Sequence, residues 1–354
     1  HFYFYIEMNL IKIILFPLLF ILKIIHLSII LIRNLLYDFN IYKKTKFKIN
    51  IISVGSLKIG GAGKTPLVEY LIKVLNNNKI AILSRGYKRR TKGFMISNKT
   101  HKSNEIGDEP RQIKHNHPDL LVAVCENRIE GVKRLLEKNS NIKTVILDDG
   151  HQHRKIEKDL NILVTEYEKL YSDDMLFPLG NLRDSILSAK RANIIVVTKC
   201  PKKISSELKN KIKSQLSLNS NQKLFFSHIV YKNLKNIKTG KDEKLKIKEK
   251  YFLLTGIGNS NPLKNYLKSK KVLFKHYKFP DHYYYKEKDI KKIILEGVKK
   301  ETTNLILTEK DFFRLTKSNI KYLCSHFNLF YLKIEFDFND DEKQNFNKQI
   351  LKFI

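Results

Sequence analysis

One short stretch constrains this chain more than any other, "VGSLKIGGAGKTP" at residues 54–66, because it reads as a phosphate-binding loop with one departure. The motif G-x-x-x-x-G-K-[ST] requires a glycine five positions before Gly63, and Lys58 stands there instead. The preceding run "INIISVGS" (49–56) is typical of a buried β-strand, and "TPLVEYLIKVL" (65–75) carries apolar residues at helical spacing. The glycine-rich piece is therefore predicted to join a strand to a helix, which is the context that the motif demands.

The residue types in this loop suit a bound polyphosphate. Gly60, Gly61 and Gly63 let backbone N–H groups turn toward an anion without obstruction by a Cβ, and the helix N-terminus adds partial positive charge. Lys64 is predicted to reach the β- and γ-phosphates, and the Thr65 hydroxyl to bind Mg²⁺. A glycine-rich turn without a ligand is the alternative. The predicted nucleotide contacts are Lys58, Ile59, Gly60, Gly61, Ala62, Gly63, Lys64 and Thr65.

A second strand is predicted to supply carboxylates for the metal ion. The run "KTVILDDG" (143–150) has the β-branched pattern of a buried strand and ends at Asp148 and Asp149, where ligands bind in open α/β sheets. One of the two is predicted to hold Mg²⁺, directly or through water, and the other to orient it or meet the substrate. A solvated pair of loop carboxylates is the alternative. Pro201 stands two positions past Lys199, where a guanine-specific site has an acidic residue, so ATP is the predicted nucleotide.

The excess of basic residues favours an anionic partner. There are 67 Lys and Arg against 35 Asp and Glu, a formal net charge of +32, which suits nucleic acid, a phosphorylated substrate or an acidic membrane. The lysines are spread over every segment and form no single basic block, so we predict no nucleic-acid partner. Cys125, Cys200 and Cys324 lie far apart without metal-ligand spacing, which argues against a zinc site or disulfides and fits a reducing compartment.

Residues 10–36 form a strongly apolar run that Lys12, Lys23, His26 and Arg33 interrupt. On a helix these four side chains fall within one wedge of about 80°. Such a helix is predicted to lie in the bilayer interface, with its cationic stripe toward anionic headgroups. A single membrane span and a helix packed on the protein's own core are the alternatives.

Together, the motifs resemble one family, the tetraacyldisaccharide 4'-kinases, which phosphorylate a lipid A precursor in Gram-negative bacteria. The resemblance covers nearly the whole chain and rests, in the family's order, on "SVGSLKIGGAGKTP", "SRGY", "GDEP", "DDGHQH" followed by "KDLNI", "LFPLGNLRDS", "TGIGNSNP", "FPDHYYY" and "TEKDFFRL". The family also lacks the first phosphate-loop glycine, so Lys58 is a departure of the family's kind. Two positions differ: His151 stands where a large apolar residue is expected, and Asn181 where proline is usual.

The resemblance implies an ATP-dependent transfer of the γ-phosphate to the 4'-hydroxyl of a tetraacylated glucosamine disaccharide 1-phosphate, giving lipid IVA. By the family pattern the base is Asp108 of "GDEP", made a better acceptor by His282 of "FPDHYYY". Read without the family, Asp108 is a helix N-cap and His282 a solvated or core histidine. The implied catalytic set is Asp108, His282 and Lys64. The predicted substrate-binding side chains are Arg85, Arg128, Gln152 and Arg183, with Arg183 ranked first.

The predicted fold is α/β, with a P-loop NTPase-like core and a mostly parallel sheet, a smaller α/β C-terminal domain and an N-terminal amphipathic helix. A charged segment marks the predicted domain junction, and "KLKIK" within it alternates at strand period, which favours a short ribbon over a disordered linker. The predicted domains are residues 1–45 for the membrane-associating helix, 46–232 for the P-loop kinase domain, 233–250 for the linker or ribbon, and 251–354 for the C-terminal domain.

These domains place His282 apart from Lys64 and Asp108, so the sequence predicts a site in the cleft between them. A membrane-associated P-loop switch ATPase is the alternative function, because the loop, Asp148 and the apolar helix would serve it equally well. A basic nucleic-acid-binding ATPase is a third reading that rests on charge alone. The predicted partners are the acylated lipid substrate and a membrane surface, the predicted location is the cytoplasmic face of the inner membrane, and the sequence gives no oligomeric state.

Overall fold

The computed structural model describes residues 2–75, 79–247 and 249–353, with side chains described from residue 15 onward. The chain forms two compact units, and each draws on several stretches of sequence. Unit 1 comprises His1–Lys64, Lys143–His228 and Phe338–Ile354, and unit 2 comprises Thr65–Ile142 and Ile229–Asp337. The domain boundaries inferred from the sequence stay a prediction.

Unit 1 is built on a parallel sheet with the strand order β8–β7–β6–β1–β5. The interior strands are rich in Ile, Leu and Val and are buried on both faces, as parallel strands covered by helices require. Val54 of β1 lies beside Asp148 of β5, so these two strands end together at one edge of the sheet. The strand bounds are β1 Asn50–Gly55, β5 Thr144–Asp148, β6 Leu160–Glu166, β7 Ile194–Thr198 and β8 Lys223–Asn236, whose first residues pair with β7.

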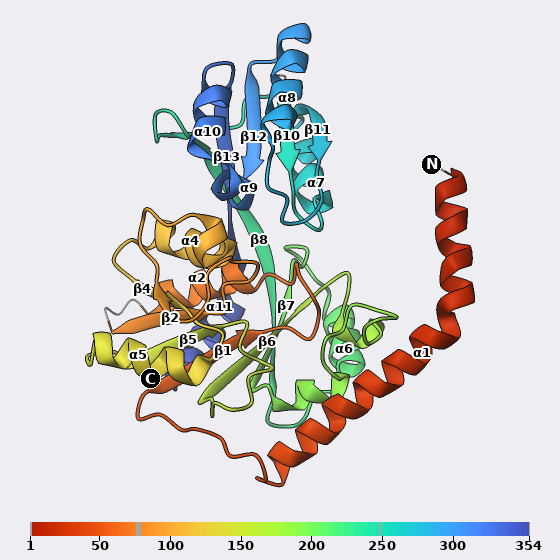
Figure 1. Ribbon diagram of the computed structural model, residues 1–354, viewed down its shortest axis with the longest axis vertical. Helices are drawn as coiled ribbons and strands as arrows, with labels where there is room; N and C mark the ends of the chain where they lie inside the picture. The colour runs from red at the N-terminus through yellow and green to blue at the C-terminus, as the bar shows by residue number, and fades with distance from the viewer. Residues whose placement is uncertain (1, 76–78, 248, 354) are drawn as a thin grey trace. The chain divides into compact units, whose positions relative to one another are not determined.

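Helices complete unit 1 (Figure 1). The buried core beside β6 and β7 includes Leu163, Ile195 and Tyr171, and Leu27 and Ile30 of the N-terminal helix pack against it. The C-terminal helix is tied to β8 because the Glu342 carboxylate accepts a hydrogen bond from the Phe226 amide at 2.7 Å. The helices are α1 Phe2–Asp38, α6 Ser206–Gln215 and α11 Asp340–Leu351, with short 3₁₀ turns η1 Tyr171–Asp173 and η2 Ile186–Arg191.

His26 and Arg33 of the predicted cationic stripe of α1 bond to the protein, which corrects the orientation expected for these two side chains; the side chain of Lys12 lies outside the described residues. His26 Nδ1 lies 3.0 Å from the Phe177 carbonyl, and the Arg33 guanidinium donates to the Gln152 carbonyl at 3.1 Å. Asn34 donates to the Ser188 hydroxyl at 3.3 Å. The reason is that the loops of unit 1 offer carbonyl and hydroxyl acceptors that satisfy these side chains. The apolar circumference of α1 is left facing outward.

Unit 2 contains two groups of strands. In the first, β2 Ile80–Ser84 and β4 Leu121–Val124 pair in parallel, and the short β3 Met95–Ile96 joins β4 antiparallel. Asn127 caps the helix that follows β4, because its side chain accepts hydrogen bonds from the Ile129 and Glu130 amides. The helices of this part are α2 Lys64–Leu75, α3 Ser103–Ile106, α4 Asp108–Asn116 and α5 Arg128–Lys138.

The second group of strands in unit 2 has the order β11–β10–β12–β13–β8, with parallel pairing from β11 to β13. The predicted ribbon is a hairpin at the end of β8, because β9 pairs antiparallel with Leu234 and Lys235. Residues 244–247 of the alternating "KLKIK" lie outside any strand, and Lys248 lies outside the described residues. The bounds are β9 Asp242–Glu243, β10 Lys250–Thr255, β11 Leu273–Lys278, β12 Asn304–Thr308, β13 Asn328–Phe338, α7 Asn261–Ser269, α8 Glu287–Lys299, α9 Glu309–Arg314 and α10 Lys317–Cys324.

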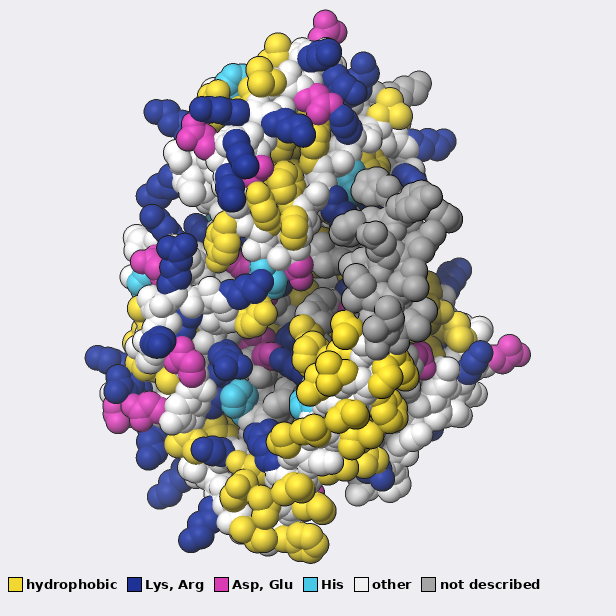
Figure 2. All heavy atoms as spheres, turned by 45° about the vertical axis from the view of Figure 1, so that its right-hand side comes forward, with side chains coloured by type: hydrophobic (Ala, Val, Ile, Leu, Met, Phe, Trp, Pro, Cys, Tyr) yellow, Lys and Arg dark blue, Asp and Glu magenta, His cyan; other side chains and the backbone are white. Residues whose placement is uncertain are grey.

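The strand pairing confirms the predicted α/β class with mostly parallel sheets, since the pairs along β8–β7–β6–β1–β5, along β11–β10–β12–β13 and between β2 and β4 are parallel, while β3 with β4 and β9 with β8 are antiparallel. The predicted apolar N-terminal helix is also present. Its segment Leu15–Asp38 is long and apolar enough to cross a membrane by length and composition, and none of its apolar window is buried. Figure 2 shows hydrophobic side chains gathered along this helix.

Candidate active site

The phosphate loop of unit 1 runs from the end of β1 to the first residue of α2, as the sequence predicts. Gly60, Gly61 and Gly63 all adopt positive φ, at 73°, 64° and 86°, a region that glycine enters without steric cost. A Cβ added at Gly61 would meet the Glu166 carboxylate at 3.2 Å. The Ala62 carbonyl accepts a hydrogen bond from the Thr198 hydroxyl at 2.9 Å, which fixes the loop against the end of β7. The loop is thus a preformed, glycine-lined cradle.

Lys58 takes the place of the missing glycine without a left-handed backbone conformation. Its φ is not positive, and the residue forms an extended antiparallel bridge with Leu182. The Lys58 ammonium is buried and lies 2.5 Å from the Asp174 carboxylate, and its amide donates to the Ser56 hydroxyl at 3.1 Å. The chain therefore uses Lys58 to fasten the phosphate loop to the segment that contains Asp174.

Asp149 lies at the centre of the basic groups beside this loop. The Lys64 ammonium is 3.1 Å from its Oδ1, and Arg183 binds both of its oxygens, with Nη1 2.6 Å from Oδ2. Arg183 also donates to the Ser56 carbonyl at 3.1 Å. Burial alone would raise the pKa of Asp149, but the charges of Lys64 and Arg183 outweigh it and hold that pKa far below its usual range. Asp149 is therefore a carboxylate at neutral pH, and its φ of 58° turns it out of the strand.

The predicted metal ligands fit a magnesium ion held together with phosphate oxygens. Asp148 and Asp149 are adjacent carboxylates at the end of β5, and the Thr65 hydroxyl belongs to the second residue of α2; Asp148 and Thr65 are both buried. Among the described residues no group of three or more His, Cys, Asp or Glu side chains could hold an ion without further ligands. That donor set agrees with Mg²⁺, which usually binds through one or two carboxylates plus substrate phosphates.

Two residues of the segment after β5 shape the wall of this site. His151 is fully buried; its Nε2 lies 3.0 Å from the Ser188 carbonyl, and burial holds its pKa well below the usual value, so it is neutral. A Cβ added at Gly55 would meet the His151 Cβ at 2.4 Å, which explains the glycine at the end of β1. Gln152 donates to the same Ser56 carbonyl that Arg183 binds, at 2.9 Å. His151 is therefore a structural replacement for an apolar residue.

In unit 2, the turns of "SRGY" and "GDEP" approach each other through two glycines. Gly107 has a φ of 92°, and a Cβ there would lie 3.1 Å from the backbone of Gly86, which itself has a φ of 71°. This close approach requires glycine at both positions. Gly107 precedes α4, so Asp108 is the first residue of that helix, where a carboxylate also interacts favourably with the helix dipole.

The Asp108 carboxylate is bonded to a histidine and an arginine of unit 2. Its Oδ2 lies 2.9 Å from His282 Nδ1 and 2.7 Å from Arg314 Nε, while its Oδ1 is buried and has no hydrogen-bond partner among the described residues. Burial raises the pKa of Asp108, but the hydrogen bond from His282 and the charge of Arg314 lower it to about 2. Asp108 is therefore ionised at neutral pH, with one oxygen held and the other open to a further donor.

Further contacts fix His282 and Arg314 in place. Arg314 donates to the Gly256 carbonyl at 2.6 Å and to Asp311 Oδ1 at 3.2 Å, and its side chain is 1% exposed. Asp311 Oδ1 also accepts from the Gly256 amide, at 3.0 Å. His282 has a φ of 59°, uncommon outside glycine, and its amide donates to the Gly256 carbonyl at 3.1 Å. The segments "TGIG", "FPDH" and "TEKDFFR" together hold the partners of Asp108.

The predicted substrate-binding residues lie in different surroundings. Arg183 and Gln152 of unit 1 both contact Ser56, and Arg183 also contacts Asp149. Arg85 of unit 2 is exposed and forms no hydrogen bond or ion pair with a described residue. Arg128 is buried, and its Nη1 donates to the Cys125 carbonyl at 2.6 Å in the turn before α5. Of the four, Arg183 is thus brought to a predicted site residue, Asp149, and Gln152 shares the Ser56 carbonyl with it.

Sequence reasoning missed several side chains that support these groups. Arg314 and Asp174 were given no role, although Arg314 belongs to a motif that carries the family resemblance. A buried pair of carboxylates in unit 2, Glu69 of α2 and Glu309 of α9, was also missed. Asn116 of α4 donates to both, at 2.7 and 3.0 Å. No local pattern marks such partners, because each pairing joins segments that are far apart in the sequence.

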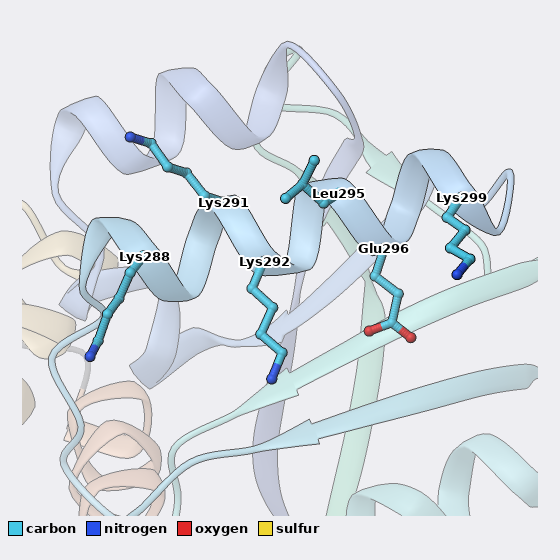
Figure 3. Close-up of a pocket in the computed structure, with 6 residues that line it drawn as sticks. All are labelled: Lys288, Lys291, Lys292, Leu295, Glu296 and Lys299. Atoms are coloured by element: carbon cyan, nitrogen blue, oxygen red, sulfur yellow. The ribbon is translucent and has the colours of Figure 1, made fainter.

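A hollow on the surface of unit 2 lies away from these groups. Figure 3 shows that all six of its lining residues belong to α8. It contains no phosphate loop, strand-end carboxylate or histidine, so it carries no catalytic chemistry. The lining residues are Lys288, Lys291, Lys292, Leu295, Glu296 and Lys299.

Comparison with known proteins identifies the family. Residues 15–354 match the family described as tetraacyldisaccharide-1-P 4'-kinase, LpxK. The chain belongs to this family. A tetraacyldisaccharide 4'-kinase of Flavobacterium johnsoniae is 42% identical over 353 residues, and the alignment covers 98% of this chain and 98% of the relative. One from Parabacteroides distasonis is 36% identical over 332 residues, covering 91% of this chain and 90% of the relative.

A solved structure of the family has the same fold. The crystal structure of the "apo" form of LpxK from Aquifex aeolicus in complex with ATP has a TM-score of 0.72 and 28% sequence identity, covering 97% of this chain and 99% of that one. The predicted family and the predicted class of enzyme, a phosphotransferase of the tetraacyldisaccharide 4'-kinase type, are therefore confirmed.

Proposed function

We propose that this chain transfers the γ-phosphate of ATP to the 4'-hydroxyl of a tetraacylated glucosamine disaccharide 1-phosphate, giving lipid IVA. The observation that carries the proposal is the bonded group of Asp108, His282 and Arg314 in the same chain as a phosphate loop. A switch ATPase has no acceptor hydroxyl and no use for a positioned carboxylate with one open oxygen. The neighbouring structure with bound ATP supports the choice of nucleotide.

The phosphate loop and Lys64 are assigned to the triphosphate. Backbone N–H groups of the loop and the N-terminus of α2 favour negative charge, and Lys64 can leave Asp149 for the β- and γ-phosphates. The hydroxyl of Thr65 and the carboxylates of Asp148 and Asp149 are the oxygen ligands that we assign to Mg²⁺, which would neutralise charge on the phosphates when bound. Arg183 is assigned to steady the transferred phosphoryl group, because its planar fork binds two oxygens at once.

Asp108 is assigned as the base for the acceptor hydroxyl. Its open Oδ1 is the atom that accepts the hydroxyl hydrogen, while Oδ2 stays with His282 and Arg314. A low pKa does not disqualify it, because phosphoryl transfer has little bond formation to the nucleophile in the transition state and needs positioning more than base strength. His282 and Arg314 orient the carboxylate, and His282 receives part of the charge change through its hydrogen bond.

The acceptor is a lipid, so the reaction is assigned to a membrane surface, at the cytoplasmic face of the inner membrane where ATP is available. The outward apolar face of α1 supports this assignment, since its window of Leu15–Asp38 has no buried share. A charged headgroup layer would also suit the net charge of +32.

Transfer of label from γ-labelled ATP tests the proposal. The full chain is incubated with Mg²⁺ and the tetraacylated disaccharide 1-phosphate in detergent micelles, beside Lys64→Ala and the matched control Lys73→Ala. Lys73 lies on the same helix and pairs with Glu335 at the surface, away from the phosphate loop. We expect labelled lipid from the wild type and the control, and a loss of about 10²–10³-fold in Lys64→Ala. ATP turnover without labelled lipid would instead favour the switch ATPase.

A further inference from the structure

A second apolar element lies beside α1 in unit 1. The segment 174–187, which contains most of the motif "LFPLGNLRDS", exposes Met175, Phe177, Ile186 and Leu187, at 49%, 53%, 41% and 59%. Single exposed apolar side chains are ordinary, but four large ones in one short segment call for an explanation. This segment adjoins α1, because the His26 and Phe177 rings pack edge to face with centroids 6.4 Å apart.

The segment is held in this exposed arrangement from within unit 1. Asp174 is bonded to Lys58 at 2.5 Å, and the Asn181 carbonyl accepts from the Ile59 amide at 3.0 Å. A Cβ at Gly180 would lie 2.2 Å from the Met175 carbonyl, so the turn is tight. Phe177 is therefore displayed at the tip of a braced turn rather than on a loose loop.

The outward face of α1 continues the apolar surface. His26, Arg33 and Asn34 of this helix bond to unit 1, so these polar side chains do not belong to its outward face. Along the described part of the helix, the large apolar side chains at least two-fifths exposed are Leu15, Phe16, Leu18, Phe20, Ile21, Leu22, Ile24, Ile25, Ile29, Ile32 and Leu35.

The charge next to this surface indicates what covers it. Residues 39–48, "FNIYKKTKFK", follow α1 and contain Lys43, Lys44, Lys46 and Lys48 with no acidic residue. All four lysines are exposed, although Lys46 pairs with Glu157 at 3.3 Å, and Phe39, Ile41 and Tyr42 beside them are exposed as well. Lysines flanking exposed apolar side chains suit a bilayer with anionic headgroups, where the lysines meet lipid phosphates and the apolar groups enter the acyl region.

We propose that segment 174–187 inserts into the bilayer together with the outward face of α1, and that the lysines of residues 43–48 bind the anionic headgroups at its rim. This inference deepens the proposed function, on which it rests, by adding a second membrane-inserting element to the helix.

The absence of tryptophan from the sequence allows a direct test. Phe177→Trp places one fluorophore at the tip of the turn, and Leu295→Trp, at a residue of α8 that is 72% exposed, is the matched control. Full-length variants are mixed with vesicles of equal parts phosphatidylethanolamine and phosphatidylglycerol that contain no substrate. We expect the emission of Phe177→Trp to shift to shorter wavelength and to be quenched by brominated phospholipids, and that of Leu295→Trp to stay unchanged. Emission of Phe177→Trp that does not respond to these vesicles would overturn the proposal.

A second pair of variants tests the energetics. Phe177→Ser with Leu187→Ser should lower partitioning into the same vesicles by about tenfold, because two half-exposed apolar side chains no longer enter the bilayer. Leu295→Ser with Val298→Ser, on α8, should bind as the wild type does. Unchanged partitioning with lost transfer in micelles would assign the segment to substrate acyl chains instead, and loss of a wild-type dimer would assign it to a second copy of the chain; both would overturn the proposal. Neither vesicle assay depends on phosphate transfer, so its failure is distinct from failure of the proposed function.

Discussion

The group around Asp149 in unit 1 and the group around Asp108 in unit 2 both place a carboxylate between two basic side chains, yet they leave it in different states. Asp149 has both oxygens occupied, by Lys64 and Arg183. Asp108 has one oxygen held by His282 and Arg314 and the other buried without a partner among the described residues. The difference indicates that the first group exchanges partners when a polyphosphate arrives, whereas the second keeps an acceptor ready.

The two groups also hold their carboxylate with different rigidity. The Arg314 side chain is 1% exposed, whereas that of Arg183 is 28% exposed. A buried arginine with several acceptors fixes its partner, and a partly exposed one can turn to a new anion at lower cost. The comparison therefore predicts that substitutions in the group around Asp108 lower kcat, and that substitutions in the group around Asp149 lower kcat and also weaken ATP binding.

Removal of the negative charge of Asp108 should have the largest effect on phosphate transfer. In Asp108→Asn the side chain keeps its size but loses the charge that accepts the hydroxyl proton, and we expect kcat to fall by about 10²–10⁴-fold with ATP binding retained. The control is Asp281→Asn, whose carboxylate lies 4.0 Å from the other ring nitrogen of His282 and is partly exposed. Steady-state kinetics of both variants with lipid substrate measure the effect. Near wild-type transfer in Asp108→Asn would remove the base assignment and with it the contrast between the two groups.

Loss of the contact between Arg183 and both oxygens of Asp149 should have the next largest effect on phosphate transfer. Arg183→Lys keeps the charge but cannot bind both oxygens of one partner, and we expect kcat/KM for ATP to fall by about 10–100-fold. Arg191→Lys is the control, because Arg191 pairs with Asp184 at 3.0 Å in the same segment. Titration of ATP in a transfer assay separates KM from kcat. If KM for ATP were unchanged, the exchange of partners at Asp149 would not include Arg183.

The third effect is a shift in the pH dependence of the rate of phosphate transfer. The hydrogen bond from His282 and the charge of Arg314 together lower the pKa of Asp108 to about 2 against the effect of burial, so Asp108 stays ionised down to strongly acidic pH. In Arg314→Lys that pKa should rise toward the ordinary value, which moves the acid limb of the rate profile to higher pH and lowers kcat by about tenfold. Arg111→Lys serves as control, since Arg111 donates to the Phe313 carbonyl and not to Asp108. A rate profile with an unmoved acid limb would show that another group sets it.

The smallest expected effect concerns stability rather than transfer. Burial raises the pKa of both Glu69 and Glu309, that of Glu309 to about 7, so the folded protein binds more protons than the unfolded chain between about pH 4.5 and 7. Stability should therefore fall as pH rises through that window. Glu309→Gln should reduce this fall in thermal melts, whereas Glu335→Gln, which removes an ion-paired surface carboxylate with a lowered pKa, should not. Equal slopes in wild type and Glu309→Gln would show that the raised pKa of Glu309 does not cause the fall in stability.

Much of the phosphate loop and its flanking elements could be predicted because this chemistry is local in the sequence. The strand, glycine-rich loop and helix of residues 49–75 lie next to one another in the sequence, and the period of apolar residues marks each element. The family resemblance added Asp108 and His282, which no spacing joins, since they are 174 residues apart. Arg314 and Asp174 were missed because their roles arise only when distant segments meet. The side of α1 that faces the protein was misjudged because a polar stripe on a helix looks the same whether water, headgroups or protein carbonyls satisfy it.

The arrangement of unit 1 has a consequence for the order in which the chain matures. Its first stretch carries the phosphate loop, but its last stretch begins at Phe338 and supplies α11, whose Glu342 binds the Phe226 amide and pairs with Lys209. A ribosome must therefore release almost the entire chain before the unit that contains the phosphate loop can close its core. Until then the apolar helix at the other end has already been made, while the unit that Leu27 and Ile30 pack against is still incomplete.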